Sequence, residues 1–356
     1  MDRDGAAEQS GTAGAAEPRT RRNRPTGGGV TMEAVGRLAG VSQVTVSRAL
    51  NDPSKVSAET LRRIEEAIAT TGYVPNAVAG ALASSRSRLV TALVPSITNV
   101  VYSSLVKSFI EGMRAQGYQI LLSETGFDPV EEEALIAAHL SRRPDAILLT
   151  GIHHTAKARH QLLGAGIPVV EVWDITDTPI DMCVGFSHSE AGRRVADFAV
   201  ESGYSVAATV TAADERARRR ARAFTEQFEA RAGRTVTTVE LPGPASLAEG
   251  RRALATLIES GDFTTGAVFC SSDLLAHGAL IELHVRGIAV PGQVAVIGFG
   301  DQDFAPYTEP ALTTVSVDRT ELGRRAASAL IARLAGEPRK DAVINLGYQI
   351  VRRGSA

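Results

Sequence analysis

The most restrictive feature of this sequence is a regular alternation, from Leu89 onward, between short β-branched apolar segments and helical patterns. Such alternation is typical of βαβ units, in which crossover helices join parallel strands. Because so much strand and helix would overfill a single doubly wound sheet, the sequence predicts two such halves. The expected strands cover residues 89–94, 118–122, 146–150, 168–172, 206–210, 236–241, 267–270 and 294–299.

The segment before this alternation predicts a small helical domain of three short helices, between residues 30 and 71. Gly40 separates the first two helices, and Val35, Val46 and Leu50 are available to lock them together. The expected N-cap residues are Thr31, Ser42 and Ser57.

Two further segments flank this helical domain. Residues 1–29 contain almost no large apolar side chain and are expected to form a disordered tail. Residues 72–75 break the helical pattern, and Asn76 can then cap one further short helix through residue 83.

Charge and cysteine usage narrow the class of protein. The stretch 19–63 has nine Lys and Arg against three Asp and Glu, a net charge of +6, which leaves −8 for the rest because the whole chain carries −2. A basic head on an acidic body predicts an anionic partner at one end. Cys183 and Cys270 are too few for a disulfide framework and are expected to be buried thiols. With no apolar run of membrane-spanning length and no secretion signal, the cytoplasm is expected.

The second predicted helix carries a candidate DNA-reading face. Its residues four apart stack, so Gln43, Val44 and Arg48 share one side. Arginine can bond guanine in the major groove, glutamine can bond adenine, and valine can pack on the thymine methyl group. These three are the candidate base-reading residues, although a small helical subdomain of an enzyme shows the same bare pattern. The candidate phosphate contacts are Thr31, Ser42, Thr45, Ser47 and Asn51.

A resemblance adds to this interpretation, and it is carried by the run GVSQVTVSRALNDPSKVSAETLRRIEEAIATTGYVPNAVAGALASSRS. This run resembles the DNA-binding head and hinge of the lactose-repressor (LacI/GalR) family of transcription regulators, and the similarity continues almost to the C-terminus. The resemblance implies a helix-turn-helix head and a hinge helix that orders on operator DNA, capped by Asn76. Leu82 of each subunit would wedge into the minor groove. Ala34, Gly36 and Gly80 depart from the family pattern, and Gly80 weakens a helix.

The same resemblance implies a periplasmic-binding-protein-like core of two lobes with an effector between them. It also implies a homodimer on double-stranded operator DNA. The expected divisions are a tail at 1–29, the helix-turn-helix domain at 30–74, the hinge helix at 75–87 and the core at 88–356. Within the core, the N-lobe would cover about 88–187 and 318–345, and the C-lobe about 188–317 and the C-terminal end.

Polar residues follow the predicted strands, where ligands bind in open α/β sheets. Arg216 and Arg220 lie four apart and can point at one spot, and guanidinium groups suit carboxylate or phosphate. In the family an arginine at the position of Arg220 commonly contacts the effector. Most of the arginines in this run are expected to form a solvated face. The candidate effector-binding residues are Ser96, Asn99, Tyr102, His153, Trp173, Asp174, Arg216, Arg220, Ser272, Asp273 and Asp301.

Several stretches, including LVPSITNVVY, DAILLTGIHHT and PIDMCVGFSHSEAG, resemble the gluconate-operon repressor branch of the family. This implies a sugar acid, gluconate or 6-phosphogluconate, as effector. A regulator of the same architecture that senses another sugar, or that activates transcription, stays open. The chain has no GxGxxG motif after a strand, no P-loop and no GxSxG, so an enzyme is disfavoured. A sugar-transport protein is disfavoured by the basic head and the missing signal peptide. No cofactor is expected, and His153 and His154 are not expected to hold a metal.

Overall fold

The computed structural model describes residues 29–76, 80 and 86–356. The chain divides into two compact units, residues 1–80 and 81–356. The expected disordered tail lies outside the described residues except for Gly29. Most of the predicted hinge helix, with the proposed wedge residue Leu82, also lies outside them.

The first unit is a helical head built as the sequence predicts. Val35, Val46, Ile64 and Tyr73 form its buried core, so each helix contributes its apolar stripe to one small cluster. The three predicted N-caps are confirmed, because each hydroxyl accepts a hydrogen bond from the backbone amide three residues ahead. The elements are α1 (Met32–Ala39), α2 (Gln43–Asn51), a 3-10 turn (Pro53–Lys55) and α3 (Ala58–Thr71).

The turn between α1 and α2 depends on two glycines. Gly40 ends α1 in the left-handed region, at φ 68°, which a residue with a side chain rarely adopts. A Cβ on Gly36 would lie 2.8 Å from the carbonyl oxygen of Val41. The glycine at position 36, a departure from the family pattern, therefore lets α1 approach the turn more closely than alanine would.

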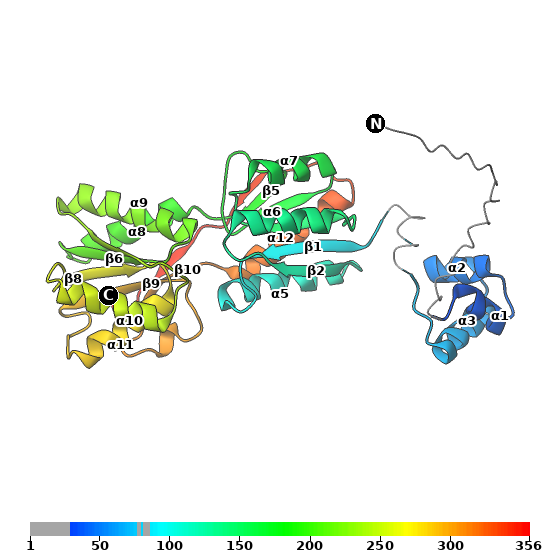
Figure 1. Cartoon of the computed structure of the whole chain (residues 1–356), viewed down its shortest axis with the longest axis horizontal. Coiled ribbons are helices and arrows are strands. Elements are labelled where there is room, and N and C mark those ends of the chain that lie inside the picture. The colour runs from blue at the N-terminus through cyan, green and yellow to red at the C-terminus, as the bar shows by residue number, and fades with distance from the viewer. Residues whose placement is uncertain (1–28, 77–79, 81–85) are drawn as a thin grey trace, which may run out of the picture. The chain divides into compact units, whose positions relative to one another are not determined.

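The N-lobe consists of a parallel sheet in the order β11-β5-β4-β3-β1-β2 and its flanking helices (Figure 1). Its strands are β1 (Leu89–Val94), β2 (Gln119–Glu124), β3 (Ala146–Thr150), β4 (Val169–Val172), β5 (Met182–Gly185) and β11 (Val343–Asn345). Its helices are α5 (Val100–Arg114), α6 (Pro129–Leu140), α7 (Ala156–Ala165) and α12 (Arg319–Leu334).

The C-lobe repeats this plan in the order β12-β10-β9-β8-β6-β7, with only β12 antiparallel to its neighbour. Its strands are β6 (Ala207–Thr211), β7 (Thr237–Glu240), β8 (Gly266–Cys270), β9 (Val294–Phe299), β10 (Thr313–Ser316) and β12 (Gln349–Val351). Its helices are α8 (His188–Glu201), α9 (Glu215–Ala232), α10 (Leu247–Glu259), α11 (Asp273–Val285) and a 3-10 turn (Ala305–Tyr307).

The strand order reverses at an equivalent place in each sheet. In the N-lobe β1 lies between β2 and β3, and in the C-lobe β6 lies between β7 and β8. Such a reversal is the topological switch point of a doubly wound sheet, and ligands bind beyond the carboxyl ends of the strands there. The loops after β1, β3, β6 and β8 are therefore where a ligand is expected.

The predicted fold class is confirmed, and all eight expected strands are present with small shifts of their ends. Four strands, β5, β10, β11 and β12, were not expected. Each has only three or four residues, and all four lie toward the far end of a sheet from β1 or β6. Such short segments become strands through pairing with distant neighbours rather than through a long apolar pattern of their own.

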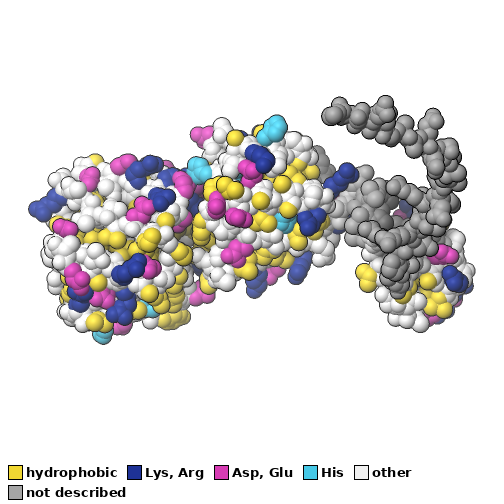
Figure 2. Space-filling model, in the orientation of Figure 1, with side chains coloured by type: hydrophobic (Ala, Val, Ile, Leu, Met, Phe, Trp, Pro, Cys, Tyr) yellow, Lys and Arg dark blue, Asp and Glu magenta, His cyan; other side chains and the backbone are white. Residues whose placement is uncertain are grey.

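The cysteines, the surface charges and the apolar character of the helices can each be described from the structure. Cys183 and Cys270 are both buried free thiols, as predicted. Charged side chains of both signs are interspersed over the visible face of the core (Figure 2). None of the helices in the described part of the chain is long and apolar enough to cross a membrane.

Candidate functional site

The predicted base-reading residues form an exposed face on α2. Gln43, Val44 and Arg48 are exposed, whereas Val46 and Ala49 on the opposite side are buried in the head. Val44 is a large apolar residue left 66% exposed, which suits contact with a thymine methyl group. Within the described residues, Arg48 takes part in no ion pair. The structure thus presents all three side chains together to an outside partner.

The predicted phosphate-contacting residues gather at helix ends. Thr31 and Ser42 cap α1 and α2, where backbone amides and the helix dipole favour an anion. The hydroxyl groups of Ser42 and Thr45 lie 2.9 Å apart. Asn51 donates to the Ser47 carbonyl oxygen at 2.9 Å, which holds its amide at the other end of α2.

On the N-lobe side of the core, the predicted residues divide between surface and interior. Asn99 caps α5 through its Oδ1, and the backbone amide of Asn99 donates to Ser96 Oγ at 3.3 Å. Tyr102 and Trp173 are buried, with ring centroids 5.7 Å apart in an edge-to-face contact. Trp173 also packs on Phe186. The lone tryptophan is thus part of the core, although its backbone has φ 76° and lies at the end of β4.

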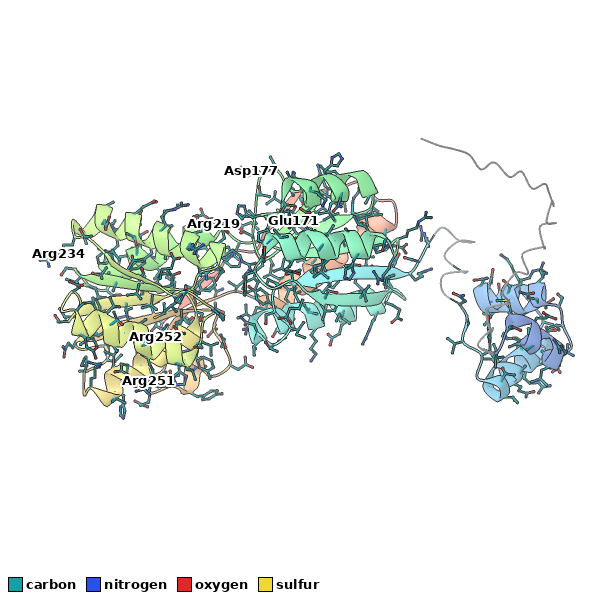
Figure 3. The ribbon with its side chains drawn as sticks, in the orientation of Figure 1. Glu171, Asp177, Arg219, Arg234, Arg251 and Arg252 are labelled. Atoms are coloured by element: carbon teal, nitrogen blue, oxygen red, sulfur yellow. The ribbon has the colours of Figure 1, made fainter. Side chains whose placement is uncertain are left out.

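The arginine run on α9 divides into two faces. Arg218 and Arg222 lie on the solvent side, where Arg218 pairs with Glu240. Arg216, Arg219 and Arg220 turn inward instead. Arg216 and Arg220 are the two arginines expected to face a ligand, so the expectation of a solvated face is wrong only for Arg219. The helix period explains this, because residues three and four apart along a helix lie on the same side, and Arg219 and Arg220 are three and four residues after Arg216. Arg219 lies at the end of α9 that faces the N-lobe, and Arg234 lies just beyond the other end of this helix (Figure 3).

Arg220 is held rigidly among buried partners. Its Nη1 donates to Nδ1 of His188 at 2.8 Å, and its Nη2 donates to the Ser271 carbonyl oxygen at 2.9 Å. Its guanidinium carbon lies 3.9 Å from the centroid of the Phe299 ring, a cation–π contact. Burial, which disfavours the charged form, lowers the pKa of Arg220 to about 10. It remains charged at neutral pH.

Arg216 joins the two lobes through Tyr102. Its Nη2 donates to the Tyr102 hydroxyl oxygen at 3.1 Å, and burial raises the pKa of that phenol. Among the described residues, three buried guanidinium nitrogens have no hydrogen-bond partner here: Arg216 Nη1, Arg219 Nε and Arg220 Nε. Buried donors of charged groups are costly to leave without a partner. An acceptor, most simply an anion, would satisfy such donors, and of the three arginines Arg216 lines a pocket.

Asp174 is the buried counter-charge of this cluster. Arg219 binds both of its carboxylate oxygens and also Glu215, with 2.8 Å between Nη2 and the Glu215 oxygen. Burial raises the pKa of Asp174, while Arg219 opposes that shift. Because Asp174 follows β4 and Arg219 lies on α9, this ion pair connects the two lobes.

His153, Asp174 and Glu215 bring possible metal-ligand atoms within 4.8 Å of one another. His153 lies 3.4 Å from Glu215 and is exposed. The guanidinium group of Arg219 already contacts both carboxylates, so it occupies the place that a cation would take. A metal ion would have to displace this arginine, and the arrangement therefore fits a metal poorly.

The C-lobe candidates are committed to bonds within their own lobe. Ser272 caps α11 through its Oγ. Asp273 is fully buried, accepting from Thr314 Oγ1 at 2.5 Å and from the Gln302 amide at 2.7 Å, and burial raises its pKa to about 6. Asp301 accepts from Arg353 at 2.7 Å. These carboxylates position the loops rather than offering open acceptors.

A pocket of about 110 Å³ lies beside Arg216. It is formed by the loops after β1, β3 and β6, together with the loop between β2 and α6. It thus lies at the switch points from which a ligand site was expected. Its charged lining residues, apart from His153, are Asp128, Glu132, Asp174, Asp214, Glu215 and Arg216.

Sequence reasoning missed a buried charge cluster beneath this pocket. His154 lies between two carboxylates, 2.6 Å from Glu132 and 3.3 Å from the fully buried Glu171. Burial opposes the charged imidazole, but the neighbouring carboxylates of Glu132 and Glu171 outweigh it and raise the pKa of His154 to about 9. His154 was considered only as a metal ligand, and no local pattern in the sequence marks it as a buried cation.

Comparison with known proteins agrees with this architecture. Residues 31–76 match the family described as bacterial regulatory proteins, lacI family, and residues 196–356 match a periplasmic binding protein-like domain. The chain is 35% identical over 337 residues to the HTH-type transcriptional regulator GntR of Pseudomonas aeruginosa, covering 94% of this chain and 98% of that protein. This chain belongs to the LacI family. It is a DNA-binding transcription regulator and not an enzyme.

Other relatives of this LacI-family regulator extend the comparison. The HTH-type transcriptional regulator GntR of Escherichia coli is 31% identical over 325 residues, covering 91% of this chain and 98% of that protein. A LacI-family regulator from Silicibacter pomeroyi has a crystal structure with a TM-score of 0.85 and 34% identity, covering 92% of this chain and 99% of that one. The lac repressor dimer bound to operator, at 23% identity and a TM-score of 0.80, shares the fold.

Proposed function

We propose that this LacI-family regulator is a cytoplasmic repressor that binds operator DNA as a homodimer and is released by a sugar acid. The observation that carries the effector proposal is the buried guanidinium nitrogen without a partner on Arg216, which lines the pocket; Arg219 and Arg220, on the same helix face, each have a further one. An anion that accepts from them would satisfy donors that are otherwise buried at a cost. The sugar-acid class also agrees with the resemblance to the gluconate-operon branch.

The charges around the pocket favour gluconate over 6-phosphogluconate. Five carboxylates line the pocket, and Arg216 is the only Lys or Arg among its described lining residues. One arginine suits a single carboxylate, and aspartate and glutamate oxygens are acceptors for the hydroxyl groups of a polyol chain. A phosphate dianion would meet like charges and lose affinity. We therefore infer a singly charged, hydroxyl-rich ligand.

The link between ligand and DNA follows from the position of this site between the lobes. An effector can shift an equilibrium only by its different affinities for two conformations. Arg216 and Arg219 reach Tyr102 and Asp174 of the N-lobe from the C-lobe. A ligand that competes for these arginines changes the contacts that hold the lobes together, and the hinge and head respond to that change.

The proposed DNA contacts follow from the exposed face of α2. Gln43, Val44 and Arg48 would read base edges, and the phosphate candidates would fix the register of the helix in the groove. A head this small covers one half-site, so two subunits on two half-sites are expected. Asn76 and Leu82 would act at the hinge between head and core.

Fluorescence anisotropy of a labelled operator, selected from a random DNA pool, tests the proposal directly. Gluconate should weaken operator binding, 6-phosphogluconate should act less, and glucose, which has the hydroxyls but no charge, should not act. The variant Arg216→Gln should lose the gluconate response, and Arg222→Gln, on the solvent face of the same helix, should keep it. Calorimetry showing no gluconate binding would reject this effector, and equal binding to operator and random DNA would reject the regulator's proposed specificity.

A further inference from the structure

His188 occupies an unusual place in the core. It is the first residue of α8, immediately after the chain has left β5 of the N-lobe for the C-lobe. Its side chain is fully buried, and each ring nitrogen has one partner. The carbonyl oxygen of Trp173 lies 2.9 Å from Nε2, and Nη1 of Arg220 lies 2.8 Å from Nδ1.

The two partners leave the imidazole a single protonation state. Arginine can only donate a hydrogen bond, so Nδ1 of His188 must accept and carry no proton. A carbonyl oxygen can only accept, so Nε2 must carry the proton and donate it. Burial and the nearby charges of Arg220, Arg216 and Arg219 lower the pKa of His188 well below its usual value. The neutral ring is therefore kept as one tautomer.

We propose that His188 is a positioning residue that joins the backbone of the N-lobe to the guanidinium of Arg220 in the C-lobe and so fixes the group of buried arginines on α9, of which Arg216 lines the pocket. The proposal goes beyond the proposed function but takes its ligand site beside Arg216 from it. His188 itself is not expected to contact the ligand, because both of its nitrogens are already bonded.

The residues around Trp173 and Arg220 explain how the His188 hydrogen bonds can couple the position of β4 to the orientation of Arg220. Trp173, whose carbonyl His188 binds, has its own ring fixed between Tyr102 and Phe186. On the other side, Arg220 is stacked on Phe299 and bonded to the Ser271 carbonyl. Neither partner can move far without breaking a buried contact. A displacement of β4 relative to α9 must therefore either turn Arg220 or break one of the two bonds of the imidazole.

Nitrogen NMR of the full-length protein tests the link without any ligand. In protein with ¹⁵N-labelled histidine at pH 7, we expect the His188 Nδ1 signal at the chemical shift of an unprotonated nitrogen and the Nε2 signal at that of a protonated nitrogen. In protein with ¹⁵N-labelled arginine, the Nη groups of Arg220 should give separate, slowly exchanging signals. The variant His188→Phe should merge them, while His160→Gln, at an exposed position on α7, should not. The opposite tautomer, a doubly protonated ring, or unchanged Arg220 signals in His188→Phe would overturn the proposal.

A second measurement separates positioning from mere stability. Gluconate affinity should fall at least about tenfold in His188→Phe, because a hydrogen bond to a charged group is lost. His188→Gln has an acceptor and a donor, and its affinity should stay within about threefold of the unmodified protein. An unchanged affinity in a folded His188→Phe, or equal losses in both variants at equal thermal stability, would overturn the proposal. If the unmodified protein does not bind gluconate, the proposed effector fails, and the two NMR spectra still decide the role of His188.

Discussion

The head and the core use their functional side chains in opposite ways. On α2 the candidate DNA-reading residues are exposed and make few bonds to the rest of the protein, so their partner is expected from outside. Between the lobes, Arg216, Arg219 and Arg220 are buried or nearly buried and are bonded to residues far away in sequence. The head can thus change its specificity residue by residue, whereas the cleft functions as a connected network.

This contrast has a physical consequence for mutation. Removing an exposed side chain costs mainly the contact that it makes with a partner. Removing one member of a buried, bonded group also leaves the remaining members without partners, at a larger cost. Substitutions in the cleft should therefore change stability and ligand response together, and those of the exposed residues Gln43, Val44 and Arg48 on α2 should change DNA binding alone.

The largest effect is expected from breaking the ion pair between the lobes. Asp174→Asn removes the buried counter-charge of Arg219 and should lower the free energy of unfolding of the core by about 3–5 kcal/mol. Urea denaturation followed by circular dichroism measures this. Asp177→Asn, at an exposed position three residues further along the chain, is the control and should have little effect. A similar small change in both variants would contradict the view of the cleft as a connected network.

The buried imidazole of His154 gives a pH dependence of known sign. Its folded pKa, about 9, lies above the unfolded value of about 6.5. Its contribution to stability is therefore fully present below pH 6.5 and is lost as pH rises through 9. We expect the core to lose about 2–3 kcal/mol of unfolding free energy over that window. Thermal unfolding between pH 6 and 9.5 measures this loss. In His154→Gln the stability should depend much less on pH over the same range. An equally steep profile in the variant would exclude His154 as the cause.

On the head, the exposed face of α2 should show the opposite behaviour. Arg48→Ala should weaken operator binding by about 1–3 kcal/mol and relax specificity at one base pair. Its thermal stability should stay unchanged, since Arg48 is exposed and in no ion pair among the described residues. Binding to a panel of single-base operator variants measures specificity, with Arg63→Ala on α3 as control. Equal weakening on random DNA would show that Arg48 contacts only phosphate.

The smallest effect is expected at the cap of α2. Ser42→Ala removes the hydroxyl that accepts from the Thr45 amide at 3.2 Å and should cost about 1 kcal/mol of head stability. It should also weaken binding to every DNA sequence by a similar factor, because a phosphate contact carries no sequence information. Ser57→Ala removes the equivalent cap of α3, away from the proposed groove, and should affect stability alone. Anisotropy and thermal melts together distinguish the two variants.

How much of the site could be anticipated depends on the range of its interactions. Arg216 and Arg220 were expected to act together because their spacing on a helix is local information. Arg219 was missed because its partner Asp174 is 45 residues away and on the other lobe. Asp273 was expected near the ligand, but its carboxylate is bonded to Thr314 and the Gln302 amide, which no local pattern indicates. The four missed strands are likewise short and depend on distant neighbours.

The order of residues by itself determined the helices of the head, their caps, the eight main strands and the exposed face of α2, because each rests on periodicity or on bonds within a few positions. Folding alone decided that Arg219 turns inward with Arg216 and Arg220, which acids these arginines meet and how His188 is protonated. Burial and partner choice are properties of three-dimensional neighbours, and a charged group changes its energy by several kcal/mol according to those neighbours.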